Sequence, residues 1–148
     1  MKQPVSTLVL VYTRDLDVLL LERADFPGYW QSVTGSREGD EPLERTAARE
    51  LEEETGIDAG ALGGVRDWQM TNVYEIYPVW RHRYADGVTH NTEHVFGLTV
   101  PAGTPVRLTP SANVLRVTVL AVRVAPATGP WRLPYFGSRY TLPLVSVV

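Results

Sequence analysis

Cysteine is absent from this chain of 148 residues. Disulfide bonds, thiolate catalysis and cysteine-based zinc sites are therefore excluded, and the fold has to rest on packing alone. A chain of this length buries about two thirds of its unfolded surface, which is enough for one hydrophobic core. We therefore expect a single domain over residues 1–148.

Lysine is nearly absent as well, since Lys2 is the only one, and the net charge is -3. This balance argues against a nucleic-acid partner held by a broad basic face. The apolar run over residues 5–12 is too short to span a membrane, and no small-residue cleavage site follows it. We expect a cytoplasmic protein without nucleic-acid or membrane partners, and both a monomer and a homodimer stay open.

Acidic residues are missing from the C-terminal part, since all 17 of them lie at or before Glu93. The segment after Asn113 is rich in valine, proline and arginine, and it shows no amphipathic helical period. We therefore treat the residues from about 114 onward as an atypical tail.

Acidic residues concentrate instead in one segment, GSREGDEPLERTAARELEEETGI, which runs from Gly35 to Ile57. The pattern predicts a loop that leads into a helix over residues 43–55, closed by Gly56. At about 100° per residue, three glutamates fall within one arc beside the apolar stripe of the helix. The glutamates are Glu50, Glu53 and Glu54, and the stripe consists of Leu43, Ala47 and Leu51.

Three carboxylates this close repel one another and raise each other's pKa unless a cation lies among them. Carboxylate oxygens are hard ligands that suit Mg²⁺ or Mn²⁺. The alternative is a solvated acidic helix face, with Arg45 and Arg49 as intrahelical partners. The position of the acids at the edge of the buried face favours the metal site.

The rest of the pattern predicts strands over residues 5–12, with a partner at 18–21, and over 65–73, 77–84 and 93–100. A loop is expected over residues 59–64. In the strand expected at 77–84, alternation puts Arg81 and Arg83 on one side and His82 on the other. Strands that flank a helix indicate a mixed sheet covered by helices.

The acidic segment fits the pattern G-x5-E-x7-R-E-U-x-E-E-x-G-U, where U is aliphatic, at every defined position. This pattern is the signature of the Nudix hydrolases, so the chain resembles that family. The resemblance implies an α/β Nudix fold, a mixed β-sheet sandwiched between helices. It also implies that Glu50, Glu53 and Glu54 bind Mg²⁺, and that Glu50 or Glu53 accepts a proton from water. Arg49 and Glu41 would hold the catalytic loop against the helix.

Residues 23–41 and 81–92 further resemble a folate-pathway group of Nudix enzymes. That resemblance implies hydrolysis of dihydroneopterin triphosphate to dihydroneopterin monophosphate and pyrophosphate. It places substrate contacts at Lys2, Arg23, Thr34, Tyr74, Glu75, Ile76 and Tyr77. Lysine and arginine neutralise phosphate charge, and tyrosine stacks on flat rings. Surface cations and core tyrosines are the alternative interpretation of these positions.

The chain departs from the resemblance in one loop. The family brings a further metal-binding glutamate near Pro110 and Ser111, and a substrate-contacting serine in a final helical segment, but this loop contains no acid. The missing acid keeps open a noncatalytic nucleotide-binding module. A Nudix pyrophosphohydrolase of nucleoside triphosphates such as dATP also stays open, because a purine and a pterin put similar rings beside a triphosphate.

Overall fold

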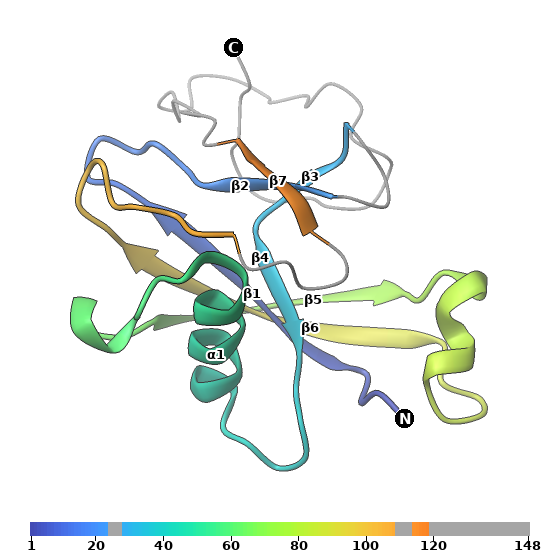
Figure 1. Ribbon diagram of the computed structural model, residues 1–148. Helices are drawn as coiled ribbons and strands as arrows, with labels where there is room; N and C mark the ends of the chain where they lie inside the picture. Colours follow the sequence, from blue (N-terminus) through green and yellow to red (C-terminus); the bar gives the residue numbers. More distant parts are fainter. Residues whose placement is uncertain (24–27, 109–113, 119–148) are drawn as a thin grey trace, which may run out of the picture.

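The computed structural model describes residues 1–23, 28–108 and 114–118. Within these ranges the chain forms two β-sheets, one α-helix and two 3₁₀ helices (Figure 1). In chain order the elements are β1 Val5–Tyr12, β2 Leu20–Arg23, β3 Trp30–Gln31, β4 Val33–Ser36, α1 Leu43–Thr55, η1 Gly60–Leu62, β5 Arg66–Glu75, η2 Pro78–Arg83, β6 His90–Thr99 and β7 Val114–Thr118.

The larger sheet is mixed and has the strand order β4-β1-β6-β5. β1 and β6 run parallel, whereas β4 pairs with β1 and β5 pairs with β6 in antiparallel fashion. Because neighbouring residues in register share a face of the sheet, the pairing assigns each side chain to one of two faces. Val9 pairs with Phe96 and with Val33, so these three side chains lie on the same face.

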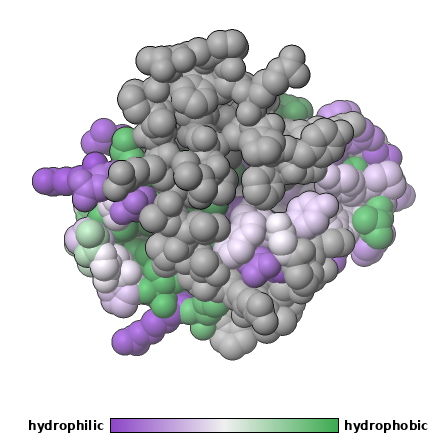
Figure 2. All heavy atoms as spheres, turned by 90° about the horizontal axis from the view of Figure 1, so that it is seen from above, coloured by the Kyte–Doolittle hydropathy of each residue, from purple (hydrophilic) through white to green (hydrophobic). Residues whose placement is uncertain are grey.

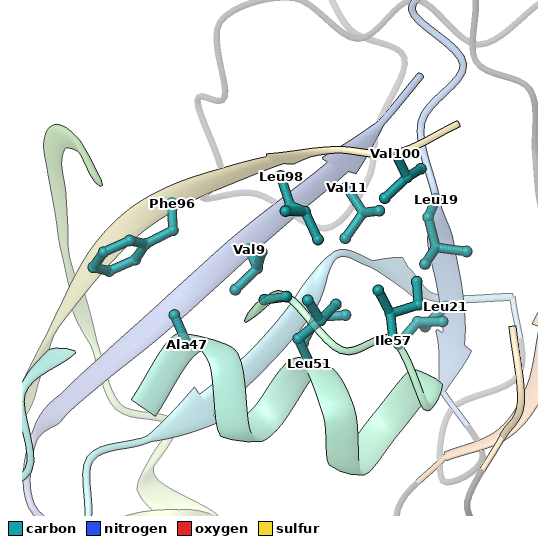
Figure 3. Packing of buried hydrophobic residues seen from close by; sticks show 12 residues of the cluster. Val9, Val11, Leu19, Leu21, Ala47, Leu51, Ile57, Phe96, Leu98 and Val100 are labelled. Atoms are coloured by element: carbon teal, nitrogen blue, oxygen red, sulfur yellow. The ribbon is translucent and has the colours of Figure 1, made fainter. Parts of the chain in front are cut away.

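Helix α1 covers that face. Ala47 and Leu51 are fully buried, and they pack into one core cluster with Val9 and Phe96 (Figure 3). The helix ends at Gly56, whose φ of 69° is the left-handed conformation that glycine adopts without strain. The helix predicted over residues 43–55 is thereby confirmed to the residue.

The smaller sheet has the strand order β3-β2-β7, and its pairs are antiparallel. In the view of Figure 1, β2, β3 and β7 gather above α1. Leu19 and Leu21 carry the core towards this sheet, and they lie near Ile57 and Val100 (Figure 3). One continuous core therefore connects α1 with both sheets.

The expected pairing of residues 5–12 with residues 18–21 is right at Val18 and Leu19 but wrong for the rest of the segment. Tyr12 and Val18 form an isolated antiparallel bridge, and the Leu19 N–H donates to the carbonyl oxygen of Val11 at 2.9 Å. β2 begins at Leu20 and belongs to the smaller sheet, whereas β1 pairs with β4 and β6. Two short apolar runs joined by a turn can pair with each other or belong to two different sheets. Here the packing of Leu19 and Leu21 into the common core determines which sheet β2 joins.

The strand expected over residues 77–84 is also wrong, because Pro78–Arg83 forms the 3₁₀ helix η2. Pro78 occupies the first turn, where its fixed φ suits a helix and its missing N–H costs no hydrogen bond. The alternation argument for Arg81, His82 and Arg83 therefore does not apply. The other expected strands are present, with β5 reaching Glu75 and β6 beginning already at His90, and residues 60–62 of the expected loop form η1.

A mixed sheet with an α-helix on one face confirms the α/β prediction. A second covering helix is not among the described residues, and the loop at Pro110 and Ser111 lies outside them, as do residues 119–148. A single domain over residues 1–148 therefore stays a prediction. In the part of the chain that the structure describes, no helix is long and apolar enough to cross a membrane. Figure 2 shows hydrophilic side chains projecting from the margins, with smaller hydrophobic patches between them.

Candidate active site on the acidic helix

Arg49 lies at the centre of the acidic cluster. Its Nη2 donates to Glu41 Oε1 at 2.8 Å and to the carbonyl oxygen of Ser36 at 3.1 Å. Its Nη1 donates to Glu50 Oε1 at 2.9 Å and to Glu53 Oε2 at 3.4 Å. One guanidinium thus ties the loop before the helix to the acids on it. These contacts support the predicted roles of Arg49 and Glu41, which stay predictions.

Glu41 is the acid held most firmly in its ionised form. Its Oε1 accepts hydrogen bonds from the Glu38 backbone N–H and from the Thr46 hydroxyl, each at 3.0 Å. The hydrogen bond from Arg49 is the largest of the effects that lower the pKa of Glu41 to about 2. Glu41 therefore anchors Arg49 as a permanent anion.

We expect Glu41 to make stability depend on pH in acid. The folded pKa of about 2 lies below the ordinary value of 4.5, so the stabilisation is present above pH 4.5 and is lost as the pH falls towards 2. In urea titrations between about pH 5 and pH 2.5, the free energy of unfolding should fall more steeply for the wild type than for Glu41→Gln. Glu44→Gln, which changes an exposed acid of the same helix, should keep the wild-type slope. Equal slopes for wild type and Glu41→Gln would contradict the anchoring role.

Glu50 lies directly against β4, and it can do so because residue 35 is glycine. A Cβ placed on Gly35 would overlap the carboxyl group of Glu50. The Glu50 side chain is only 15% exposed, and burial raises its pKa while Arg49 opposes the rise. The first glycine of the acidic segment thus makes room for a helix carboxylate.

Glu54 is the most perturbed acid of the helix. It is 9% exposed, and its Oε2 has no hydrogen-bond partner among the described residues. Burial, followed by the negative charge of Glu50, raises the pKa of Glu54 to about 8, although a backbone hydrogen bond from Thr34 opposes the rise. A buried carboxylate oxygen without a donor is costly, and a bound cation would offset that cost.

The donor set of Glu50, Glu53 and Glu54 fits a hard divalent cation in its chemistry, and the orphaned Oε2 of Glu54 supports the same conclusion. In the described ranges, however, no three acidic or histidine side chains converge on one point. Glu50 and Glu53 contact Arg49 instead. Each of these contacts uses one carboxylate oxygen, so the other oxygen of Glu50 and of Glu53 is not engaged by Arg49.

Two cations flank the acids. Lys2 Nζ lies 3.5 Å from Ser36 Oγ, and its charge acts to lower the pKa of Glu50. Arg23 acts in the same sense on Glu54. Arg23 also reaches Thr34 through one side chain, because Arg23 Nη1 donates to Gln31 Oε1 and Gln31 Nε2 donates to Thr34 Oγ1, both at 3.3 Å. The structure thus brings Lys2, Arg23 and Thr34 to the acidic helix face.

An aromatic pair extends this region. The guanidinium carbon of Arg23 lies 5.6 Å from the ring centre of Trp80, within the range of a cation–π contact. Tyr77 meets Trp80 edge to face at 5.4 Å, and Tyr77 is 56% exposed. Neither Trp80 nor Gln31 was predicted from the sequence. Proline at position 78 was the available signal that Trp80 lies on a turn of helix rather than in a strand.

The remaining predicted contacts lie at the end of β5. The hydroxyl of Tyr74 accepts a hydrogen bond from Asn91 at 3.0 Å. Glu75 pairs with Arg81, whose Nε also donates to the carbonyl oxygen of Ile76 at 3.0 Å. Ile76 is only 4% exposed, so its side chain faces the interior. Of the two tyrosines in this group, Tyr77 is exposed and Tyr74 is half-buried.

Comparison with known proteins assigns the family, because the NUDIX domain model matches residues 2–127. The chain belongs to the Nudix hydrolases. It is 49% identical over 102 residues to a dihydroneopterin triphosphate diphosphatase of Escherichia coli (strain K12), and the match covers 68% of each chain. It is 43% identical over 97 residues to a protein of the same name from Haemophilus influenzae, covering 64% of this chain and 61% of that one.

A solved structure agrees with these Nudix relatives. The structure of the E. coli dihydroneopterin triphosphate pyrophosphohydrolase superposes with a TM-score of 0.72 and 43% sequence identity, covering 81% of this chain and 82% of that one. The chain is accordingly a Nudix enzyme that hydrolyses phosphoanhydride bonds with the help of a divalent metal ion. This assignment favours an enzyme over the noncatalytic module.

Proposed function

We propose that this Nudix hydrolase cleaves dihydroneopterin triphosphate to dihydroneopterin monophosphate and pyrophosphate, with Mg²⁺ as its metal ion and Mn²⁺ as a substitute. The observation that carries the proposal is the 49% identity to the E. coli relative named for this substrate. The arrangement of acids and flanking cations supports it, since a triphosphate needs both a metal ion and positive side chains.

In this proposal Glu50, Glu53 and Glu54 would hold the metal ion, which would lower the pKa of a bound water and neutralise phosphate oxygens. Glu50 or Glu53 accepts the proton of that water. Arg49 sets the positions of both carboxylates through the hydrogen bonds described above. Lys2 and Arg23 bind the triphosphate oxygens, and Tyr77 with Trp80 presents aromatic surface beside Arg23.

Pyrophosphate release from a panel of triphosphates tests the proposal. We would compare 7,8-dihydroneopterin triphosphate, dGTP and dATP with Mg²⁺ and with Mn²⁺, using the Glu54→Gln variant as the blank. The expected result is the highest kcat/KM for the pterin substrate. A higher kcat/KM for dATP would replace the proposal by the nucleoside triphosphate alternative.

Arg23→Ala should mainly weaken substrate binding. Loss of charge-assisted hydrogen bonds worth about 1.5–3 kcal/mol should raise KM about 10- to 150-fold and leave kcat within a few fold. Arg14→Ala, which removes the same charge from the exposed turn between β1 and β2, is the matched control and should keep the wild-type KM. If the two variants had the same KM, Arg23 would not be a phosphate ligand.

A small-molecule substrate without a nucleic-acid partner agrees with the net charge of -3. The cytoplasmic location and the choice between monomer and homodimer stay predictions. Light scattering on the purified chain decides the second of these.

A further inference from the structure

The face of the larger sheet that points away from α1 carries a group of polar side chains at one end. Val9 and Phe96 face α1, so alternation places Ser6 of β1 and Glu93 of β6 on the opposite face. Ser6 and Glu93 are direct neighbours in register. Their row continues on β5, where Asn72 pairs with Glu93 and Tyr74 pairs with Asn91. We call Ser6, Asn72, Tyr74, Asn91 and Glu93 the polar-face cluster.

Hydrogen bonds fix this cluster. Asn91 Nδ2 donates to Ser6 Oγ at 2.7 Å and to the Tyr74 hydroxyl at 3.0 Å. Asn72 Nδ2 donates to Glu93 Oε1 at 3.3 Å. Asn91 is 3% exposed and Glu93 is 2% exposed. Hydrogen bonds and burial therefore hold these side chains in fixed positions in the sheet.

Glu93 has few hydrogen-bond donors around its carboxyl group for a residue of the polar-face cluster that is so deeply buried. Among the described residues its one hydrogen-bond donor is the neutral amide of Asn72, and no ion pair is formed. Burial raises the pKa of Glu93, and only Asn72 opposes the rise. A buried carboxyl with so little compensation destabilises a fold, which points to a use outside folding.

The polar-face cluster also lies near Lys2, one of the two cations that we propose to bind the triphosphate. Ser6 pairs with Glu93 on one side and with Ser36 of β4 on the other. Ser36 contacts Lys2, one of the two cations beside the acidic helix. Two strand spacings separate Ser36 from Glu93, which is about 10 Å. In a substrate that joins a two-ring heterocycle to a triphosphate through a short side chain, a comparable distance separates the ring edge from the phosphates.

We propose that Glu93 recognises the ring of the substrate by accepting hydrogen bonds from its 2-amino-4-oxopyrimidine edge. The proposal rests on the proposed function, since pterins carry this edge, and guanine carries the same arrangement. The edge offers the ring N3–H and the exocyclic amino group as two parallel donors, which match the two oxygens of one carboxylate. Adenine offers an acceptor at the corresponding ring nitrogen, so an ionised Glu93 rejects it. Asn72 is the positioning residue, because its Nδ2 donates a hydrogen bond to Glu93 Oε1.

Glu93→Gln is the decisive variant because it keeps the shape and replaces one acceptor by a donor. We expect kcat/KM for 7,8-dihydroneopterin triphosphate and for dGTP to fall at least about thirtyfold, since a charge-assisted pair is lost. The values for dATP and for inorganic tripolyphosphate should stay within about threefold, because neither carries this edge. Glu52→Gln, an exposed acid of α1, should leave all four values unchanged.

Equilibrium binding provides a readout without turnover. Calorimetry with 7,8-dihydroneopterin, which lacks phosphates, should show a dissociation constant at least about tenfold higher for Glu93→Gln than for the wild type. Asn72 is only partly buried, so Asn72→Ala should fold and should weaken the same ligand by a smaller factor. This second variant keeps the test valid if Glu93→Gln fails to fold.

The outcomes separate the two proposals. An equal loss for all four substrates in Glu93→Gln, or unchanged values for the pterin and dGTP, would overturn the role of Glu93. A greater loss for dATP would do so too, because it would mean that a neutral Glu93 donates to adenine. If the wild type ignored the pterin substrate but preferred dGTP to dATP, and Glu93→Gln abolished that preference, the role of Glu93 would stand and the proposed function would fall.

Discussion

Replacing Glu54 by Gln should lower kcat by at least about a hundredfold and leave the fold intact. The change removes one negative charge and keeps the shape of the side chain. The Oε2 atom of Glu54 has no hydrogen-bond partner in the described residues, so no protein contact is lost there. The expected loss therefore comes from the metal site and not from the core.

Stability measurements distinguish this explanation from a structural one. The pKa of Glu54 in the folded state, about 8, lies above its ordinary value of 4.5. In EDTA, stability should therefore fall as the pH rises from 4.5 through 8, and Glu54→Gln should remove most of this slope. Added Mg²⁺ should raise the Tm of the wild type at pH 8 and raise that of Glu54→Gln much less.

The matched control is Glu52→Gln, on the exposed face of the same helix. It should keep the wild-type kcat and the wild-type response to Mg²⁺. Near wild-type turnover of Glu54→Gln at saturating Mg²⁺ would remove Glu54 from the metal site.

The helix and its acids could be predicted from the sequence because the signals there are local. Leu43, Ala47 and Leu51 repeat at helical spacing, and Gly56 ends the run in the left-handed conformation that few other residues adopt. The same spacing fixes which acids share a face. No contact with a distant segment is needed for any of these steps.

The contacts of the polar-face cluster and of Arg23 could not be predicted, because they depend on pairing between distant segments. Ser6 and Asn91 are 85 residues apart in the sequence and hydrogen-bonded in the structure. Only the parallel register of β1 with β6 shows that Glu93 faces away from α1. Arg23 and Trp80 likewise meet through tertiary packing. Periodicity assigns alternate faces to a strand, but it does not say which strand lies beside which.

Gly35→Ala should be nearly as damaging as the loss of a metal ligand. A Cβ at this position overlaps the carboxyl group of Glu50, which then has to turn away from β4 and from Arg49. A displacement of about 1 Å at a catalytic group costs on the order of a hundredfold in rate. The backbone at Gly35 does not have the positive φ that makes alanine strained, so the variant should fold.

Two comparisons isolate the overlap with Glu50. Gly60→Ala adds the same methyl group where its nearest neighbour is the flexible carboxylate of Asp58 at 3.1 Å, and it should keep the wild-type kcat. Glu50→Asp shortens the side chain with which a Cβ at position 35 would overlap. This second substitution should therefore reduce kcat less in the Gly35→Ala variant than in the wild type. Such coupling is expected for residues in direct contact. If the effects of Gly35→Ala and Glu50→Asp on log kcat were simply additive, Gly35 would act through the strand and not through Glu50.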